Sequence, residues 1–412
     1  MEAIFFMINI IGLGYIGLPT ALMFAKSGMK VVGTDYNINL VNSLRDGDLT
    51  FKEGGLDELF QEALSNGIEF STKYQKTNIY IVAVPTPYLK ESKKLDSKYV
   101  VSAINSILDV CEIGSTIIIE STITPGTIDK HIRPEIEKRG LVVGEDVHLL
   151  HAPERIIPGN MIYELEHNSR TIGADNKEIG SKIKALYQKF CKSEIILTDI
   201  RSAEMSKVVE NTYRDINIAF ANELAKICRS DNMDVYEIIR IANMHPRVNI
   251  LQPGPGVGGH CISVDPWFLV GDYPDLTNLI FTARKTNDSM PTHVLGRIRD
   301  IMRENGINDL SKVGLYGLTY KENVEDTRES PTLQLLERMN EHLAFGVKVF
   351  DPFIKERIVD HQFMNFEDFL NEIEILVIMV GHKHIKDNIN LIKDKHVLDT
   401  KNICSSEGNY KL

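Results

Sequence analysis

The chain has 412 residues, 43% of them hydrophobic, so it is long enough for two or three domains with cores of their own. Acidic residues outnumber basic ones by 57 to 46, and the formal net charge is -11. This balance does not suggest a nucleic acid or an anionic membrane as a partner, because phosphate groups attract a basic face. A phosphorylated small molecule stays compatible with it, since a few placed Arg and Lys side chains bind a phosphate.

The five cysteines are scattered and never spaced as CxxC. We therefore expect no disulfide framework, no metal site, and a reducing, cytoplasmic compartment. The apolar stretch Ala3–Ile11 contains Asn9 and has no basic segment before it, so it predicts a first buried strand and not a signal sequence. No run reaches the roughly 18 apolar residues of a membrane span.

Short β-branched runs alternate with helical patterns up to about residue 197. Apolar runs without polar alternation, separated by helices, predict a parallel sheet covered on both faces. The expected strands are Ile4–Ile11, Lys30–Thr34, Ile79–Val84, Thr116–Glu120, Val147–His151 and Glu194–Thr198.

Helical patterns then cover Ser202–Cys228, Val235–Ala242 and Leu276–Asn287, with a glycine-rich loop at 252–260. After about residue 305 the alternation resumes, with expected strands Val313–Leu318, Val347–Asp351, Ile375–Met379 and Val397–Thr400. The sequence thus predicts an α/β protein with two Rossmann-like, doubly wound parallel-sheet domains joined by a long helix and a helical region. The expected domain boundaries are 1–198, 199–302 and 303–412.

Gly12, Gly14 and Gly17 form a GxGxxG motif that follows the first strand and opens a helix, and a second strand ends at Asp35. The glycines permit a tight turn against a pyrophosphate, and the helix N-terminus supplies N–H donors to it. The Asp35 carboxylate can accept from a ribose 2′-hydroxyl and would repel a 2′-phosphate, which predicts NAD in preference to NADP.

Two further loops follow predicted strands, 84–87 and 120–126, and carry the hydroxyls of Thr86 and Thr122. Ligands bind at the carboxyl ends of such strands, so these hydroxyls are candidates for the cofactor. Pro and Thr that merely end strands explain them equally well. The loop 151–159 holds Glu154 and Arg155, which form either a site or an ordinary loop ion pair.

Glu204, Lys207, Asn211 and Arg214 are spaced by three or four residues and share one face of the long helix. Such a stripe is most often a solvated face. Apolar neighbours leave little room for another wet face, however, and Lys and Asn one turn apart can both donate to a developing oxyanion.

Cys261 follows a run of glycines, and Asp265 stands four residues later. A lone cysteine is usually an inert buried residue, but the glycines allow a substrate to approach this one. A thiolate adds to an aldehyde, and the thiohemiacetal can give a second hydride to NAD before a thioester is hydrolysed. The segment thus predicts oxidation of an alcohol to an acid.

Taken together, these segments resemble the UDP-glucose/GDP-mannose dehydrogenase family over essentially the whole chain. The matching motifs are GLGYIGLP, VPTP, ESTITPGT, APER, AEMSKVVENTYR, GPGVGGHCISVDPW and GLTYKENVEDTRESP. The resemblance implies an NAD domain, a central helical dimerisation region and a C-terminal domain for the nucleotide sugar. It implies a homodimer or a dimer of dimers as the assembly.

The cysteine loop departs from the pattern of the family's UDP-glucose enzymes, which have Ser before the cysteine and Lys before the aspartate. Here these positions hold His260 and Val264, and Trp267 follows. This version resembles the branch that oxidises UDP-N-acetyl-D-mannosamine. UDP-N-acetylglucosamine is the alternative substrate.

Carried over by resemblance, Cys261 is the nucleophile, Lys207 and Asn211 handle the proton and the oxyanion, and Asp265 and Glu154 support them. The implied contacts to the UDP-sugar are Arg155, Ile156, Lys207, Asn211, Arg214, His245, Arg247, Gly258, Tyr320 and Lys321, with His245 or Arg247 reaching in from a dimer partner. The implied NAD contacts, besides the glycines, are Tyr15, Ile16, Asp35, Thr86, Thr122 and Arg328.

Two other interpretations stay open from the residues alone. A two-electron β-hydroxyacid dehydrogenase explains the N-terminal half and the Lys/Asn pair, but neither the second α/β domain nor the cysteine loop. A non-catalytic NAD-sensing protein on the same scaffold would not need Cys261. The number of NADH molecules formed for each substrate separates these classes.

Overall fold

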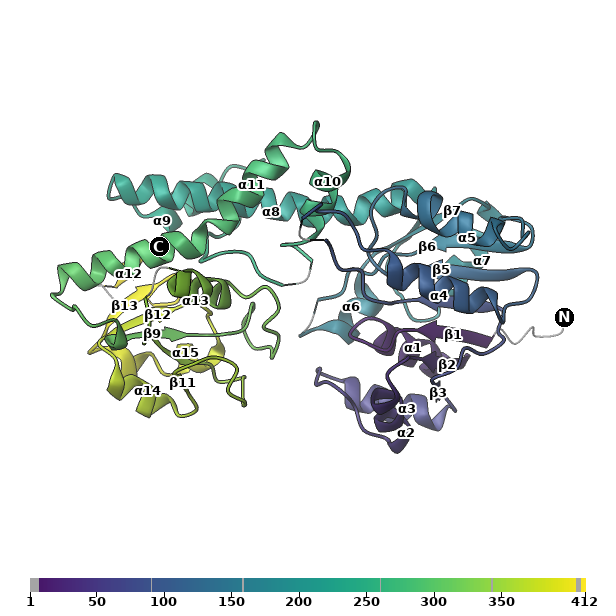
Figure 1. Cartoon of the computed structure of the whole chain (residues 1–412), viewed down its shortest axis with the longest axis horizontal. Helices are drawn as coiled ribbons and strands as arrows, with labels where there is room; N and C mark the ends of the chain where they lie inside the picture. Colours follow the sequence, from purple (N-terminus) through teal and green to yellow (C-terminus); the bar gives the residue numbers. More distant parts are fainter. Residues whose placement is uncertain (1–6, 90, 158, 260, 342–343, 405–408) are drawn as a thin grey trace. The chain divides into compact units, whose positions relative to one another are not determined.

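The computed structural model describes residues 7–412 except 90, 158, 260, 342–343 and 405–408. The chain forms two compact units, Met1–Val209 and Glu210–Leu412 (Figure 1). The division falls inside the long helix α8, Ile200–Ser230, which continues without interruption from one unit into the other. No helix in the described part of the chain is both long and apolar enough to cross a membrane.

The first unit is built on an eight-stranded sheet of order β3-β2-β1-β4-β5-β6-β7-β8. Its strands are β1 Met7–Ile11, β2 Lys30–Thr34, β3 Glu69–Ser71, β4 Ile79–Val82, β5 Ser115–Ile119, β6 Val147–His151, β7 Arg170–Ala174 and β8 Ile195–Thr198. Its helices are α1 Gly17–Lys26, α2 Ile38–Asp46, α3 Leu56–Ser65, α4 Lys98–Leu108, the π-helix η1 Ile128–Ile132, α5 Arg133–Glu137, α6 Met161–His167 and α7 Lys177–Tyr187.

The predicted strands of this unit are confirmed, with ends that differ by at most two residues within the described part. Residues 4–6 of the first predicted strand lie outside the described part. Two strands, β3 and β7, were not predicted. The expectation of a purely parallel sheet is wrong at one pair, because β7 runs antiparallel to β6 while β8 is parallel to β7. The first six strands keep the order of a dinucleotide-binding fold.

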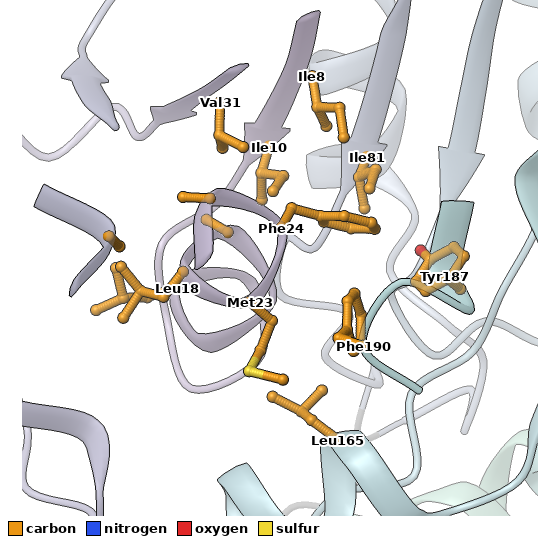
Figure 2. Packing of buried hydrophobic residues seen from close by; sticks show 14 of the residues in the cluster. Ile8, Ile10, Leu18, Met23, Phe24, Val31, Ile81, Leu165, Tyr187 and Phe190 are labelled. Atoms are coloured by element: carbon orange, nitrogen blue, oxygen red, sulfur yellow. The ribbon is translucent and has the colours of Figure 1, made fainter. Parts of the chain in front are cut away.

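Both faces of this sheet are buried, as the uninterrupted apolar runs predict. Ile81 and Ile118 belong to a core that includes α1 and α7, whereas Val82 and Ile119 belong to a second core under α4. In Figure 2 the ring of Phe24 on α1 lies beneath the sheet and faces two aromatic rings near the end of α7. These are Tyr187 and Phe190, whose ring centroids lie 5.3 and 5.0 Å from that of Phe24 in edge-on geometry.

The second unit begins with the rest of α8 and continues with α9 Val235–Ala242, α10 Asp265–Asp272, α11 Asn278–Asp288 and α12 Met290–Glu304. A six-stranded parallel sheet follows, of order β11-β10-β9-β12-β13-β14. Its strands are β9 Val313–Tyr316, β10 Lys348–Phe350, β11 Gln362–Phe363, β12 Ile375–Ile378, β13 His396–Asp399 and β14 Tyr410–Lys411. The helices around it are η2 Leu310–Lys312, α13 Pro331–Glu341, α14 Phe366–Glu372, α15 Lys383–Asp387 and η3 Ile389–Ile392.

The turn after the first strand of the second sheet, β9, has the same hydrogen bond as the turn after β1 in the first sheet. In the first unit the N–H of Leu13 donates to the carboxylate of Asp35 at 2.9 Å. In the second, the N–H of Leu318 donates to the carboxylate of Asp351 at 2.6 Å. The predicted pair of doubly wound domains is therefore confirmed in topology and in this detail.

Candidate active site

The glycine-rich turn between β1 and α1 has the three spatial roles that a dinucleotide turn requires. Gly12 has φ +91°, a backbone angle that residues with a side chain rarely adopt. A Cβ on Gly17 would lie 1.8 Å from the carbonyl oxygen of Gly12. A Cβ on Gly14 would meet nothing within 4 Å. The first and third glycines thus close the turn onto the helix, and the second leaves open space where a pyrophosphate can approach.

Asp35 lies beside this turn, at the carboxyl end of β2. Its Oδ2 accepts from the N–H of Leu13 and its Oδ1 from the N–H of Asn37, both at 2.9 Å. The side chain is half-buried, and each carboxylate oxygen keeps a lone pair for a further donor. The turn and this carboxylate fit the phosphates and the ribose of NAD.

The two predicted loops reach the same edge of the sheet, because β1, β4 and β5 are neighbours. The hydroxyl of Ser121 donates to the carbonyl of Val84 at 2.7 Å and so connects the two loops. Thr86 is buried and Thr122 is half-buried beside them. Their contact with a cofactor stays a prediction.

The remaining predicted NAD residues are placed as follows. The Tyr15 ring is 39% exposed and stacks obliquely on Phe51, with the centroids 4.5 Å apart. Ile16 is the N-cap residue of α1. Arg328 belongs to the second unit, where its guanidinium donates to Asp326 at 2.6 Å.

Glu154 takes part in a buried ionic cluster at the carboxyl end of the sheet, not in a solvated loop ion pair. Its Oε2 accepts from Arg170, whose other guanidinium nitrogen donates to Glu120 at 3.3 Å. Glu120 also accepts from the hydroxyl of Tyr187, and the guanidinium lies 4.7 Å from the centre of that ring. Burial raises the pKa of Glu120 to about 7, although Arg170 opposes the shift.

Arg155 and Ile156 follow Glu154 in the chain. The Arg155 guanidinium donates to Ser169 and Thr171 near and on β7, at 3.0 Å each. Ile156 is buried against the core. These contacts fasten the loop to the sheet, and the substrate contacts expected of both residues stay predictions.

Most of the polar stripe on α8 faces inward, so the solvated face expected of such a stripe is wrong for three of its four members. Glu204 accepts from the N–H groups of Gly126 and Ile128 and thereby holds the loop after β5. Lys207 and Asn211 are 7% and 6% exposed, one helical turn apart. Arg214 is exposed.

In the second unit, Asn211 meets the segment that follows the cysteine loop. Its Nδ2 donates to Oδ2 of Asp265 at 2.6 Å, and both side chains are buried. The N–H of Asp265 donates to the carbonyl of Cys261 at 2.8 Å, so the aspartate sits one turn from the cysteine. Cys261 itself is exposed. The structure therefore brings Asn211 together with Cys261 and Asp265, which the sequence selected in a separate segment. His260 lies outside the described residues.

The glycines before Cys261 lie against the loop that follows β9. A Cβ on Gly258 would lie 2.6 Å from the carbonyl oxygen of Glu329, and one on Gly259 would lie 2.8 Å from the ring of Tyr320. Gly259 also has φ +86° and donates its N–H to the carbonyl of Arg328 at 3.0 Å. Only glycine fits this packing, and it brings the cysteine loop beside Tyr320.

Three residues complete the description of this unit's site. His245 and Arg247 are exposed in the segment after α9 and take no part in the contacts described above. Lys401, which follows β13, was not selected from the sequence; its Nζ lies 3.6 Å from where a Cβ on Gly254 would be. A basic residue just past a predicted strand was the available signal, since ligands bind at that edge.

Family models match along the chain in order. The UDP-glucose/GDP-mannose dehydrogenase family's NAD binding domain matches residues 6–191, its central domain 201–289 and its UDP binding domain 314–406. No group of His, Cys, Asp or Glu in the described residues is arranged to hold a metal ion.

Relatives match over nearly the full length. UDP-N-acetyl-D-mannosamine dehydrogenase of Methanocaldococcus jannaschii is 42% identical over 97% of this chain and 93% of its own. NDP-N-acetyl-D-galactosaminuronic acid dehydrogenase of Ralstonia nicotianae is 37% identical over 97% and 96%. The native structure of the Staphylococcus aureus UDP-N-acetyl-mannosamine dehydrogenase is 41% identical, with a TM-score of 0.87 over 98% of both chains. The chain belongs to the UDP-glucose/GDP-mannose dehydrogenase family.

Proposed function

We propose that this NAD-dependent enzyme oxidises the C6 alcohol of UDP-N-acetyl-D-mannosamine to the carboxylate. The observation that carries the chemistry is the exposed Cys261 beside the buried Asn211–Asp265 pair. A thiol at the end of a glycine-lined loop can reach and attack an aldehyde. A two-electron dehydrogenase does not need such a thiol. The identity of the sugar rests on the full-length relatives.

The reaction requires two hydride transfers and one water. NAD, when bound, accepts a hydride from C6 in each oxidation. Between the two, the Cys261 thiolate adds to the aldehyde; after the second, water displaces it from the thioester and the acid leaves. One UDP-sugar, two NAD+ and one water thus give one uronate, two NADH and three protons.

Lys207 and Asn211 are the proposed donors to the oxygen at C6, and Asp265 holds the Asn211 amide. Glu154, fixed by Arg170, is the proposed support for the attacking water. Arg155, Ile156, Arg214, Gly258, Tyr320 and Lys321 are the proposed UDP-sugar contacts, to which we add Lys401. Tyr15, Ile16, Thr86, Thr122 and Arg328 are the proposed NAD contacts.

The proposed functional domains are residues 1–198, 199–302 and 303–412. The proposed location is the cytoplasm, where NAD and UDP-sugars are made.

The helical region supports a homodimer. Tyr213, Phe220 and Ile227 repeat every seven residues on α8 and are 61, 53 and 49% exposed. Ile238 and Ile241 on α9 are also exposed. Such a row of large apolar side chains is typical of a surface that a second copy covers. His245 or Arg247 would then serve the partner's site. A Phe220→Glu variant that still sediments with the wild-type mass would contradict this part.

The function is tested with a panel of UDP-sugars and NAD, read by NADH absorbance and by mass spectrometry of the product. We expect UDP-N-acetyl-D-mannosamine to give two NADH for each uronate, and UDP-glucose to be poor. UDP-N-acetylglucosamine is the principal competitor, and UDP-N-acetylgalactosamine belongs in the panel because of the Ralstonia relative. A single NADH for each substrate molecule would overturn the four-electron assignment.

A further inference from the structure

The cysteine loop has little structure of its own to hold it in place. In the described residues from Asn243 to Val264 no helix or strand is formed, and the loop contains Pro253 and Pro255. Proline has no N–H, so Gly254 carries the only backbone donor in Pro253-Gly254-Pro255. That donor points into the protein: its partner is Oδ1 of Asn222 on α8, at 2.8 Å, in a buried contact.

The Asn222 amide has a defined direction. Its Nδ2 donates to Oδ1 of Asn287 on α11 at 2.8 Å. The Nδ2 of Asn287 in turn donates to the backbone carbonyl and the carboxylate of Asp215, at 2.9 and 2.7 Å. These side chains are at most 1% exposed. We refer to Asn222, Asn287 and Asp215 as the amide relay.

The end of the amide relay sets its direction. The backbone carbonyl of Asp215 can only accept a hydrogen bond, and its carboxylate already accepts from Arg284 at 2.5 Å. Asn287 must therefore present its NH2 to Asp215 and its oxygen to Asn222. Asn222 must then present its NH2 to Asn287 and its oxygen to the Gly254 N–H. A flipped amide anywhere would oppose two donors or two acceptors inside the protein.

We propose that Asn222 and Asn287 are positioning residues that place the cysteine loop for reaction at Cys261. Asn222 holds the loop seven residues before the thiol. Asn287 orients Asn222, and the hydrogen bonds of its side chain within the described residues go to Asn222 and Asp215 and not to the loop. Two neighbours help at the entry to the loop: Asn217 bonds to both Asn249 and Leu251, and Asn243 to Ile250. The catalytic meaning of the inference rests on the proposed function, whereas the loop placement does not.

The test compares Asn222→Ser and Asn287→Ser with Glu223→Ala, an exposed neighbour on the same helix. The hydroxyl of a serine in a helix can bond to a backbone carbonyl of the preceding turn. Asn222→Ser therefore releases the Gly254 N–H without adding an unpaired polar group to the side chain at position 222. Hydrogen exchange of peptides covering 249–264 is measured in the full-length protein, together with kcat, KM and the affinity for NAD. We expect both serine variants to speed loop exchange at least tenfold and to lower kcat at least tenfold, with NAD affinity unchanged.

The decisive variant is Asn287→Ser, because it changes the loop only through Asn222. If loop exchange stays at the Glu223→Ala level in Asn287→Ser, the relay does not position the loop and the inference is wrong. If Asn222→Ser does not accumulate as folded protein, the Asn287 comparison still decides. An inactive wild-type enzyme would contradict the proposed function alone, since the exchange measurement needs no turnover.

Discussion

Asn211 and Asp265 share one buried hydrogen bond of 2.6 Å, although 54 residues separate them in the chain. The carboxylate accepts from Nδ2 of the amide and thereby fixes which end of the Asn211 side chain faces Asp265. Because the partner is an acceptor, the Asn211 NH2 group cannot rotate away. This contact joins the long helix to the start of α10, four residues after the cysteine.

A first prediction separates orientation from proton transfer at Asp265. Asp265→Ala removes the acceptor and should lower kcat about 10²–10³-fold, as for loss of one oxyanion donor. Asp265→Asn keeps an oxygen for Asn211 and should retain at least a tenth of the wild-type kcat. Steady-state kinetics with saturating NAD measure both. Equal losses in the two variants would show that Asp265 transfers a proton itself.

The second prediction concerns Cys261. Cys261→Ala should abolish uronate formation while UDP-sugar and NAD still bind, because no other side chain in the described site can add to the aldehyde and leave again. Cys261→Ser should be nearly inactive and should accumulate an ester on the enzyme, since an alkoxide leaves poorly. Mass spectrometry of product and protein measures this, with Cys111→Ser as the matched control. Wild-type acid production by Cys261→Ala would exclude the covalent mechanism.

Lys207 gives the third prediction. Its ammonium is proposed to stabilise charge that develops on the C6 oxygen, so Lys207→Met should lower kcat about 10²–10³-fold with a small change in KM. The buried position explains the choice of methionine, which fills a similar volume. Stopped-flow measurement of the first NADH separates chemistry from product release. A raised KM with an unchanged kcat would make Lys207 a binding residue.

The fourth prediction concerns cofactor choice. Asp35→Ala should weaken NAD binding and raise the ratio of kcat/KM for NADP to that for NAD by about tenfold or more, because repulsion of a 2′-phosphate is removed. Leu13 and Asn37 also lose their acceptor, so Asp46→Ala on α2 serves as the stability control. An unchanged ratio would mean that Asp35 does not face the ribose.

Glu120 provides a prediction of pH dependence. Its folded-state pKa is raised to about 7, mainly by burial, from an ordinary value of 4.5. Between these values the folded protein holds a proton that the unfolded chain has released, so this group's contribution to stability falls as pH rises through that window. Glu120→Gln cannot ionise and should lack this fall. Its unfolding free energy relative to wild type should therefore rise by up to about 3 kcal/mol from pH 5 to pH 8.

The pH comparison needs a control for the charges that surround Glu120. Arg170, Glu154 and Tyr187 are present in both proteins, so the comparison removes only the Glu120 carboxyl group. Glu58→Gln, exposed on α3, tests the effect of removing a carboxylate elsewhere. Denaturant titrations at several pH values measure the quantity. If the difference in unfolding free energy between Glu120→Gln and wild type does not change with pH, the proton is carried by another group of the cluster and not by Glu120.

Local patterns predicted the parts of the site that local geometry determines. Gly12, Gly14 and Gly17 are recognisable because a turn against phosphate excludes side chains at known spacings. Cys261 is recognisable because glycines precede it. Both interpretations depend on residues within one short segment, and the structure places the glycine turn between β1 and α1, as predicted.

Contacts between segments far apart in the chain could not be predicted from the sequence. Glu120 and Glu154 follow two different strands and Arg170 begins a third, and nothing in their spacing indicates that one guanidinium serves both carboxylates. The stripe on α8 was equally ambiguous, because a polar helix face has the same periodicity whether it faces water or a buried site. The strand β7 and its reversed direction also depend on pairing that no local pattern specifies.

The uninterrupted course of α8 limits how this enzyme can be divided or recombined. A break between Val209 and Glu210 would leave unpaired carbonyls on one fragment and unpaired N–H groups on the other, in the middle of a 31-residue helix. A hybrid that borrows its sugar-binding half from a relative must also preserve helix length, since one inserted residue turns everything after it by about 100°. Substrate range in this scaffold should therefore be exchanged through loops, not through whole halves.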